Sequence, residues 1–411
     1  MSHHRESITS GPNILNRACL TLSVTGLVVS PAAAEVRVQC PADTDGVDTD
    51  GDGIVDNDHV CKHLAAGDGF INMADGRLQY MFGFADVTGL TSDMVMMDGM
   101  LAANFPAPTI KVKEGQKLYL TLTNVGMAHR PDLFDPHSVH YHGFPNAAAV
   151  FDGVPEASIV INMGSSLTYF YLNAEPGTFL YHCHVEATEH MQMGMLGQLY
   201  VTPKQDGTAF SDPDGSGRVY TKFAYNDGDG STGYDVDYPI QIASFDPDFH
   251  DASFNVQPLP FALMKDRYPM LNGRGYPDTV NPLELTNTAD TEGYPSLPSQ
   301  KLNALITATK GQKILLRISS LSTTSFHTLS ALGIPMKVVG RGARILRGPG
   351  GKNLYYNTNS VDLGGGEAVD VILDTKDVTP GTYFLYAKNL DHLTNDTEDF
   401  GGMMTEIIIN P

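Results

Sequence analysis

The stretch "EGQKLYLTLTN" (114–124) has the composition and length of a short β-strand that begins after a Gly-containing turn. Nearly the same pattern returns as "KGQKILLRISS" (310–320) in the second half of the chain. Further along each half, "PGTFLYHCH" (176–184) is matched by "PGTYFLYAKN" (380–389). Because both motifs occur in the same order, the sequence predicts one β-sandwich that is present twice in tandem.

Short strands separated by Gly, Pro and Asn turns continue through most of the chain, as in "LTYFYLN" (167–173). No long stretch has a helical period, so we predict an all-β protein. A polar segment rich in Gly and Asp (202–217) divides the two halves. The expected organisation is a first sandwich over 75–205, a linker over 206–217 and a second sandwich over 218–411.

The N-terminus has the pattern of an export signal over residues 1–34. Arg17 precedes the apolar run "ACLTLSVTGLVVS" (18–30), and "PAAAE" (31–35) offers small residues for cleavage. The apolar run is too short for a membrane span. We therefore expect a periplasmic or secreted protein with no membrane span once the signal has been removed.

The chain of 411 residues carries a formal net charge of −21, which argues against a nucleic-acid partner. Within the acidic segment 35–74, four aspartates have the 1-3-5-9 spacing of a calcium loop: Asp48, Asp50, Asp52 and Asp56. His59 stands at position 12, where a bidentate acid is expected. A weak calcium loop and a solvated acidic linker both remain compatible with this pattern.

Three cysteines follow the predicted signal. Cys40 and Cys61 flank one short loop and could form a disulfide in an oxidising compartment. Cys183 would then be the unpaired thiol, and it stands between two histidines.

Strand alternation sorts the histidines near Cys183 into two groups, because alternate side chains point to opposite faces. In "HSVHYHG" (137–143) and "HCH" (182–184), Cys183 and His137 fall on one face. The opposite face carries His140, His142, His182 and His184.

The first group gains His190 and Met195 from the loop after Cys183. Two imidazoles, a thiolate and a weak thioether make the blue-copper arrangement, which is suited to one-electron transfer. A buried cysteine with methionine filling the core is the structural alternative, and zinc is the rival metal. Electrons would enter at His190, which we expect near the surface.

The second group is an imidazole-only metal site or part of one. Four neutral imidazoles packed as core would each need a hydrogen-bond partner. Only one peptide unit separates Cys183 from His182 or His184, so "HCH" would connect one metal to the other.

These motifs resemble those of the multicopper oxidase and copper nitrite reductase family of paired cupredoxin domains, which are Greek-key β-sandwiches. The resemblance implies that His137, Cys183, His190 and Met195 bind a type 1 copper. It also implies that His140, His142, His182 and His184 bind a second copper centre, at which the acceptor is reduced.

The second sandwich departs from the family pattern, because "SALG" (330–333) and "AKN" (387–389) stand where histidine motifs are expected. The remaining candidate ligands there are His327 and His392. The resemblance implies that the missing ligands come from a neighbouring subunit of a homotrimer, with His392, or less favourably His327, reaching the histidine cluster of another chain.

The expected function is that of a laccase-like oxidase, which passes electrons from a small-molecule or metal-ion donor through type 1 copper to dioxygen. A nitrite reductase-like enzyme and a non-catalytic copper electron carrier are the alternatives.

Overall fold

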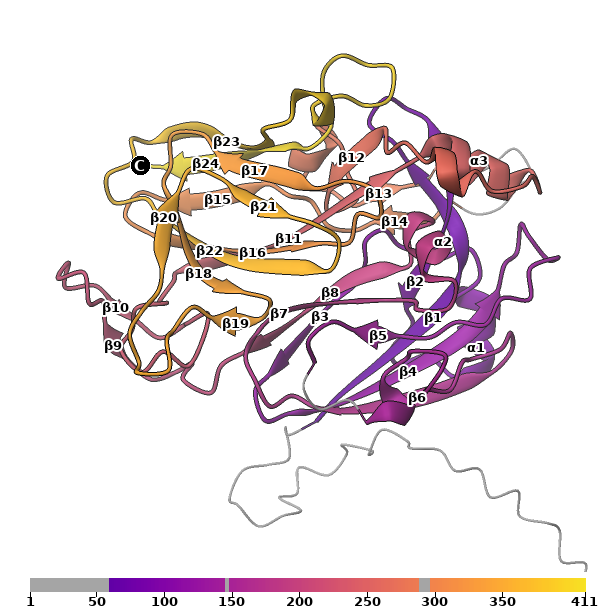
Figure 1. The fold of residues 1–411 in the computed structure, drawn as a ribbon, viewed down its shortest axis with the longest axis horizontal. Helices are drawn as coiled ribbons and strands as arrows, with labels where there is room; N and C mark the ends of the chain where they lie inside the picture. The colour runs from indigo at the N-terminus through magenta and orange to yellow at the C-terminus, as the bar shows by residue number, and fades with distance from the viewer. Residues whose placement is uncertain (1–58, 145–147, 288–295) are drawn as a thin grey trace, which may run out of the picture. The chain divides into compact units, whose positions relative to one another are not determined.

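The computed structural model describes residues 59–144, 148–287 and 296–411 (Figure 1). Strands dominate these residues and the helices are few and short, which confirms the all-β prediction. The predicted export signal, the four aspartates of the calcium-like loop and Cys40 lie outside the described residues. Cys61 is disulfide-bonded, whereas Cys183 is a free, buried thiol.

The first sandwich consists of two four-stranded sheets. One has the order β2 (Leu78–Asp86), β1 (His59–Asn72), β4 (Lys117–Gly126) and β6 (Ser166–Leu172). The other has the order β3 (Ala107–Lys113), β8 (Leu196–Thr202), β7 (Gly177–His182) and β5 (His140–Tyr141).

The second sandwich repeats this plan with additional strands. One sheet has the order β12 (Tyr268–Leu271), β11 (Val236–Phe245), β16 (Lys313–Ser320), β22 (Glu367–Asp374), β18 (Met336–Arg341) and β19 (Arg344–Ile345), with β20 (Tyr356–Thr358) also paired to β18. The other has the order β15 (Ile306–Thr309), β24 (Met404–Asn410), β23 (Gly381–Ala387), β17 (His327–Ala331) and β21 (Val361–Leu363).

The strand pairings show the tandem repeat directly. β1 runs parallel to β4 as β11 does to β16, and β3 runs parallel to β8 as β15 does to β24. The antiparallel pairs β5–β7 and β17–β23 also correspond. The two motifs that repeat in the sequence therefore form equivalent strands, as predicted.

The apolar residues of these strands fill one core in each sandwich. Leu118, Leu120 and Leu122 of β4 are fully buried on one face, which accounts for the alternation in its sequence. Every residue of β16 is buried, because its second face contacts the first sandwich. There the Arg317 guanidinium lies 4.7 Å from the ring centroid of Tyr200, and the Gln198 side chain donates to the Arg317 carbonyl at 2.8 Å.

The remaining elements are short connections. The small strands are β9 (Phe210–Ser211), β10 (Val219–Tyr220), β13 (Leu285–Thr286) and β14 (Pro298–Gln300). The α-helices are α1 (Ser92–Asp98), α2 (Ala187–Gln192) and α3 (Pro247–Phe254). The 3-10 helices are η1 (Ala149–Phe151), η2 (Phe261–Leu263), η3 (Asp278–Val280) and η4 (Leu390–His392).

The boundaries of the elements differ from the expected domain limits. β1 begins at His59 and pairs with β4 along its length, so the first sandwich takes in residues that were expected in the acidic N-terminal segment. The expected linker contains β9, which pairs with β10. The centre of β1 reads "AAGDG" (65–69), and such Ala, Gly and Asp residues give a strand a weak sequence signal.

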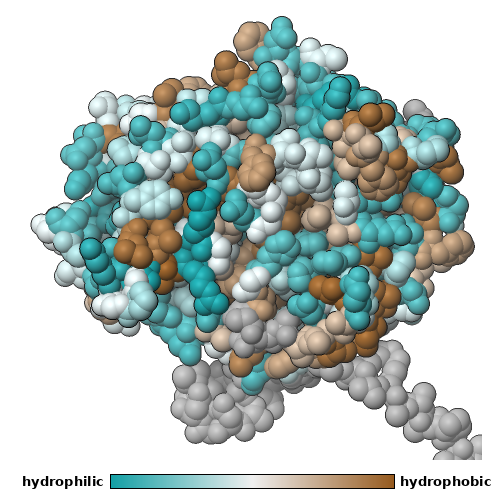
Figure 2. All heavy atoms as spheres, viewed as in Figure 1, coloured by the Kyte–Doolittle hydropathy of each residue, from teal (hydrophilic) through white to brown (hydrophobic). Residues whose placement is uncertain are grey.

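On the face seen in Figure 2, hydrophilic residues surround smaller hydrophobic patches. Within the described ranges, no helix is both long enough and apolar enough to span a membrane.

Candidate metal centres

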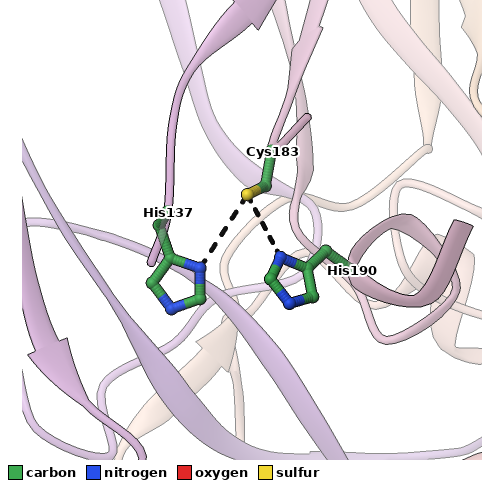
Figure 3. A group of neighbouring side chains, drawn as sticks. All are labelled: His137, Cys183 and His190. Carbon is green, nitrogen blue, oxygen red and sulfur yellow. Dashed lines mark hydrogen bonds between the residues drawn. The ribbon is translucent and has the colours of Figure 1, made fainter. Parts of the chain in front are cut away.

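The structure brings together three side chains of the first predicted group, His137, Cys183 and His190 (Figure 3). His137 is held by two backbone hydrogen bonds to Ile161, Cys183 directly follows β7, and His190 lies on α2. The Cys183 Sγ atom lies 3.8 Å from Nδ1 of His137 and 3.2 Å from Nδ1 of His190. Each of the three residues therefore directs one donor atom to a shared point.

The surroundings of this group favour neutral imidazoles and a protonated thiol. All three residues are fully buried. Burial lowers the pKa of His190 to about 4 and that of His137 well below its ordinary value, so both rings are uncharged near neutral pH. Burial likewise raises the pKa of the Cys183 thiol to about 12. A bound metal ion would take the place of the thiol proton and find two imidazoles ready as ligands.

His190 is fully buried, so the expectation that it lies near the surface is wrong. Its ring packs edge-on against Phe82, with the ring centroids 5.8 Å apart. The sequence alone could not show that Phe82 covers the His190 ring, because Phe82 lies on β2, far from His190 along the chain.

Met195 is tied to the same loop by backbone hydrogen bonds. The Cys183 amide donates to the Met195 carbonyl at 3.1 Å, and the Met195 amide donates to the His190 carbonyl at 2.8 Å. Met195 is fully buried in the same core cluster as Cys183. The loop thus holds the predicted fourth member inside the sandwich, beside the strand that carries the thiol.

The second predicted group gathers on the other side of β7. His140 of β5 is the register partner of His182. The ring centroid of His140 lies 5.4 Å from that of His142, 5.5 Å from that of His182 and 5.0 Å from that of His184. The rings of His182 and His184 are stacked at 5.6 Å. All four predicted imidazoles therefore lie next to one another.

Backbone carbonyls orient three of these rings. The Nδ1 atoms of His140, His142 and His182 lie 2.6, 3.4 and 2.6 Å from the carbonyl oxygens of Asp152, Gly366 and Cys183, respectively. An Nδ1–H that donates to a carbonyl fixes the tautomer and leaves Nε2 with a free lone pair for a metal.

The Nε2 atoms of His142 and His182 are only 2.9 Å apart. With both Nδ1 atoms protonated, two lone pairs face each other at this distance, and a bound cation would relieve their repulsion. Burial lowers the pKa of His182 to about 3 and also lowers that of His142, so neither ring is readily charged instead. This donor set suits a metal that prefers imidazole nitrogen.

A third group, which the sequence did not reveal, adjoins the first. Asp135, Glu186 and His190 place one ligand atom each within reach of a common point. The Nε2 atom of His190 lies 3.9 Å from a carboxylate oxygen of Asp135. Burial and Glu186 raise the pKa of Asp135, and they raise that of Glu189 on α2 to about 7. The sequence contains one signal that could have pointed to this group, because Asp135 and Glu186 closely precede His137 and His190.

His327 and His392 contact each other within one chain. Their Nδ1 atoms are 3.1 Å apart, and His327 is fully buried. Burial and His392 lower the pKa of His327 to about 3. This placement contradicts the expectation that His327 reaches the histidine cluster of another subunit, and it gives His392 a partner in its own sandwich.

Comparisons with known proteins agree with this geometry. Family models described as multicopper oxidase match residues 87–206 and 263–410. The chain is 29% identical over 119 residues to the copper-containing nitrite reductase of Neisseria meningitidis serogroup B, which is 27% of this chain and 28% of that protein. It is 30% identical over 118 residues to Laccase abr2 of Aspergillus fumigatus, which is 28% of this chain and 18% of that protein. The alignments thus span less than a third of the length of these two relatives.

A solved structure shares the fold across most of the chain. The Blue Copper Oxidase from Nitrosomonas europaea superposes with a TM-score of 0.60 at 22% identity, over 85% of this chain and 86% of that one. Multicopper oxidases bind copper in a type 1 centre together with additional centres, and the two imidazole-containing groups offer suitable donors. The chain belongs to the multicopper oxidase family.

Proposed function

We propose that this protein is a laccase-like oxidase that passes electrons from a small-molecule or metal-ion donor to dioxygen. The observation that carries the proposal is the His182–Cys183–His184 segment, which has one member in the thiol group and two in the imidazole cluster. Copper bound at the two groups would supply one-electron transfer at the first and reduction of the acceptor at the second.

The proposed ligands of the type 1 copper are His137, Cys183, His190 and Met195. Those of the second centre are His140, His142, His182 and His184. The backbone carbonyls of Asp152, Gly366 and Cys183 keep three of the cluster's rings in the orientation that presents Nε2. The peptide between His182 and Cys183 forms a short covalent connection between the two groups.

The surroundings of His190 favour a cationic donor. The ring itself is buried, but Glu186 is exposed and Asp135 is partly exposed, and each places a carboxylate oxygen within 4.8 Å of a nitrogen of the ring. A carboxylate pair there would attract a cation to the buried imidazole. The protein's net charge of −21 acts in the same direction.

Steady-state oxygen uptake by the copper-loaded protein tests the proposal. We expect uptake with a phenolic or a cuprous donor, and we expect the folded Cys183→Ser variant to show none. If the fully loaded, blue wild-type protein consumes no oxygen with either donor, the oxidase proposal fails.

A nitrite reductase-like activity is the second candidate, favoured by the composition of the second sandwich. In the shared register, Ser330 and Tyr386 stand where the first sandwich has His140 and His182. Because the second sandwich offers fewer imidazole ligands than the first, the acceptor centre would bind fewer copper ions. Release of nitric oxide from nitrite, without oxygen uptake, would support this reading. A blue protein that cycles rapidly between redox states but reduces neither acceptor would be an electron carrier.

We further propose that the protein is exported and forms a homotrimer. His140, His142 and His184 are only partly buried, so the cluster has an open side that a neighbouring subunit could cover. Light scattering on copper-loaded protein should give three times the mass of the chain, whereas a monomeric mass would refute the trimer.

A further inference from the structure

The second sandwich closes a loop in the same way as the sandwich that carries Cys183. The Ala387 amide donates to the Met403 carbonyl at 2.9 Å, and the Met403 amide donates to the His392 carbonyl at 2.8 Å. The corresponding bonds from Cys183 to Met195 and from Met195 to His190 are 3.1 and 2.8 Å. The two loops therefore have the same backbone connections, although they differ in length.

The strand register also identifies the residue of the second sandwich that is equivalent to His137. Ser330 pairs with Tyr386 as His140 pairs with His182, so Ala387 takes the place of Cys183 and His327 takes the place of His137. Three of the four positions keep their residue type, and only the cysteine has been replaced. The set in the second sandwich is His327, Ala387, His392 and Met403.

The two imidazoles of this set face each other as those of the first sandwich do. The ring centroids of His327 and His392 are 4.6 Å apart with an interplanar angle of 52°. The corresponding values for His137 and His190 are 5.1 Å and 55°. In both pairs the Nδ1 atoms point inward, toward Cys183 Sγ in one sandwich and toward each other in the other.

The side chain behind His327 supports binding through Nδ1. Ser322 Oγ lies 2.9 Å from His327 Nε2, where it can accept the ring proton and leave the Nδ1 lone pair free. The Asn389 amide nitrogen lies 3.3 Å from His392 Nε2 and can donate to it, which places the proton of that neutral ring on Nδ1; a metal bound there requires the other tautomer of His392. In the metal-free protein the Nδ1–H of His392 can donate to Nδ1 of His327. A metal nitrogen bond of about 2 Å to each ring requires only a small widening of the present 3.1 Å gap.

We propose that His327, His392 and Met403 form a further metal site that selects Cu(I). Without the thiolate, the donors are two neutral imidazoles and a thioether, and Ala387, Met403 and His327 are all fully buried. A soft thioether and an uncharged, buried donor set favour a soft, monovalent ion over Cu(II) or Zn(II). The site lacks the thiolate that gives blue copper its colour, so it has no intense blue band. It does not depend on which acceptor the enzyme reduces.

Anaerobic titration of the whole protein with Cu(I), against a chromogenic Cu(I) chelator, tests the site. We expect Met403→Leu to bind one fewer Cu(I) per chain than the wild type, while its Cu(II)-loaded form should keep the blue band of the first sandwich. Met336→Leu is the matched control, since Met336 is a fully buried methionine in the same core, and it should keep the wild-type stoichiometry. Equal Cu(I) content in Met403→Leu and the wild type would overturn the proposal.

A gain-of-function variant tests the geometry separately. In the Cys183→Ser background, Ala387→Cys should restore an intense blue band on addition of copper, because it adds a thiolate to two imidazoles and a thioether. His327→Phe added to that variant should remove the band. A folded Ala387→Cys protein that binds copper without colour would show that the three side chains do not meet at a common point.

Discussion

Met195 is the predicted member of the thiol group that we propose adjusts the site and does not build it. His137, Cys183 and His190 already direct three strong donors to a common point. The Met195 backbone is hydrogen-bonded to Cys183 and His190, next to these donors. A thioether is a weak axial ligand of type 1 copper, and the axial ligand sets the redox potential.

Replacing Met195 with leucine should therefore keep the blue colour and raise the redox potential. The volume of the buried side chain is nearly preserved, so the free energy of unfolding should fall by no more than about 1.5 kcal/mol. Redox titration followed by visible absorption measures both the colour and the potential. Loss of the blue band in a folded Met195→Leu protein would show that the thioether is essential to the site.

At the scale of secondary structure, the end of β7 directs three consecutive side chains to two different groups, the thiol group and the histidine cluster. Its alternation sends Cys183 toward the sandwich core and sends His182 and His184 to the histidine cluster, which the sequence predicted from parity alone. The prediction succeeds because the alternation continues past the last strand residue. It could not reveal what orients the cluster, since the carbonyl beside His142 belongs to Gly366, in the turn before β22 of the second sandwich.

Gly366→Ala should disturb the second centre without affecting the blue site. Gly366 has φ +87°, and an added Cβ would lie 2.9 Å from Nδ1 of His142. We expect reduced copper occupancy at the cluster, slower acceptor reduction and an unchanged blue band. Metal analysis together with absorption spectroscopy separates the two centres.

Gly311→Ala provides the control, because Gly311 has φ +96° and nothing within 4 Å of an added Cβ. Both variants should lose about 1–2 kcal/mol of stability from the left-handed backbone, but only Gly366→Ala should lose copper. Equal copper contents in the two variants would exclude a role for Gly366 in positioning His142.

At the scale of the whole molecule, buried polar contacts join the two sandwiches. Thr178 of β7 donates to a carboxylate oxygen of Asp370 in β22 at 2.6 Å. His250 of α3 lies between two carbonyl oxygens, with Nδ1 2.6 Å from that of Tyr80 and Nε2 2.9 Å from that of Gln192. The sequence indicated two repeated sandwiches but did not indicate how they pack against each other, because such contacts depend on residues far apart along the chain.

The burial of His250 predicts a loss of stability in acid. Burial outweighs the two carbonyls and lowers its pKa to about 4, from 6.5 in the unfolded chain. Between these values the unfolded chain binds a proton that the folded chain does not, so the free energy of unfolding is highest above pH 6.5 and falls as the pH decreases toward 4. At about 1.4 kcal/mol per pKa unit, this residue contributes a loss of about 3 kcal/mol.

Urea unfolding of the metal-free protein across this pH range checks the contribution of His250. A His250→Gln variant should be less stable near neutral pH, and its stability should fall less steeply toward acid than that of the wild type. Parallel pH profiles for the two proteins would mean that His250 is not a source of the acid sensitivity.

The central claim is that Cys183 and its neighbours bind a type 1 copper in the first sandwich. The most direct test is the visible absorption of the copper-loaded wild-type protein beside that of Cys183→Ser, with folding checked by circular dichroism. Thiolate-to-copper charge transfer should give the wild type an intense blue colour, and the folded serine variant should be colourless. A wild-type protein that binds copper in full but stays colourless would contradict the account.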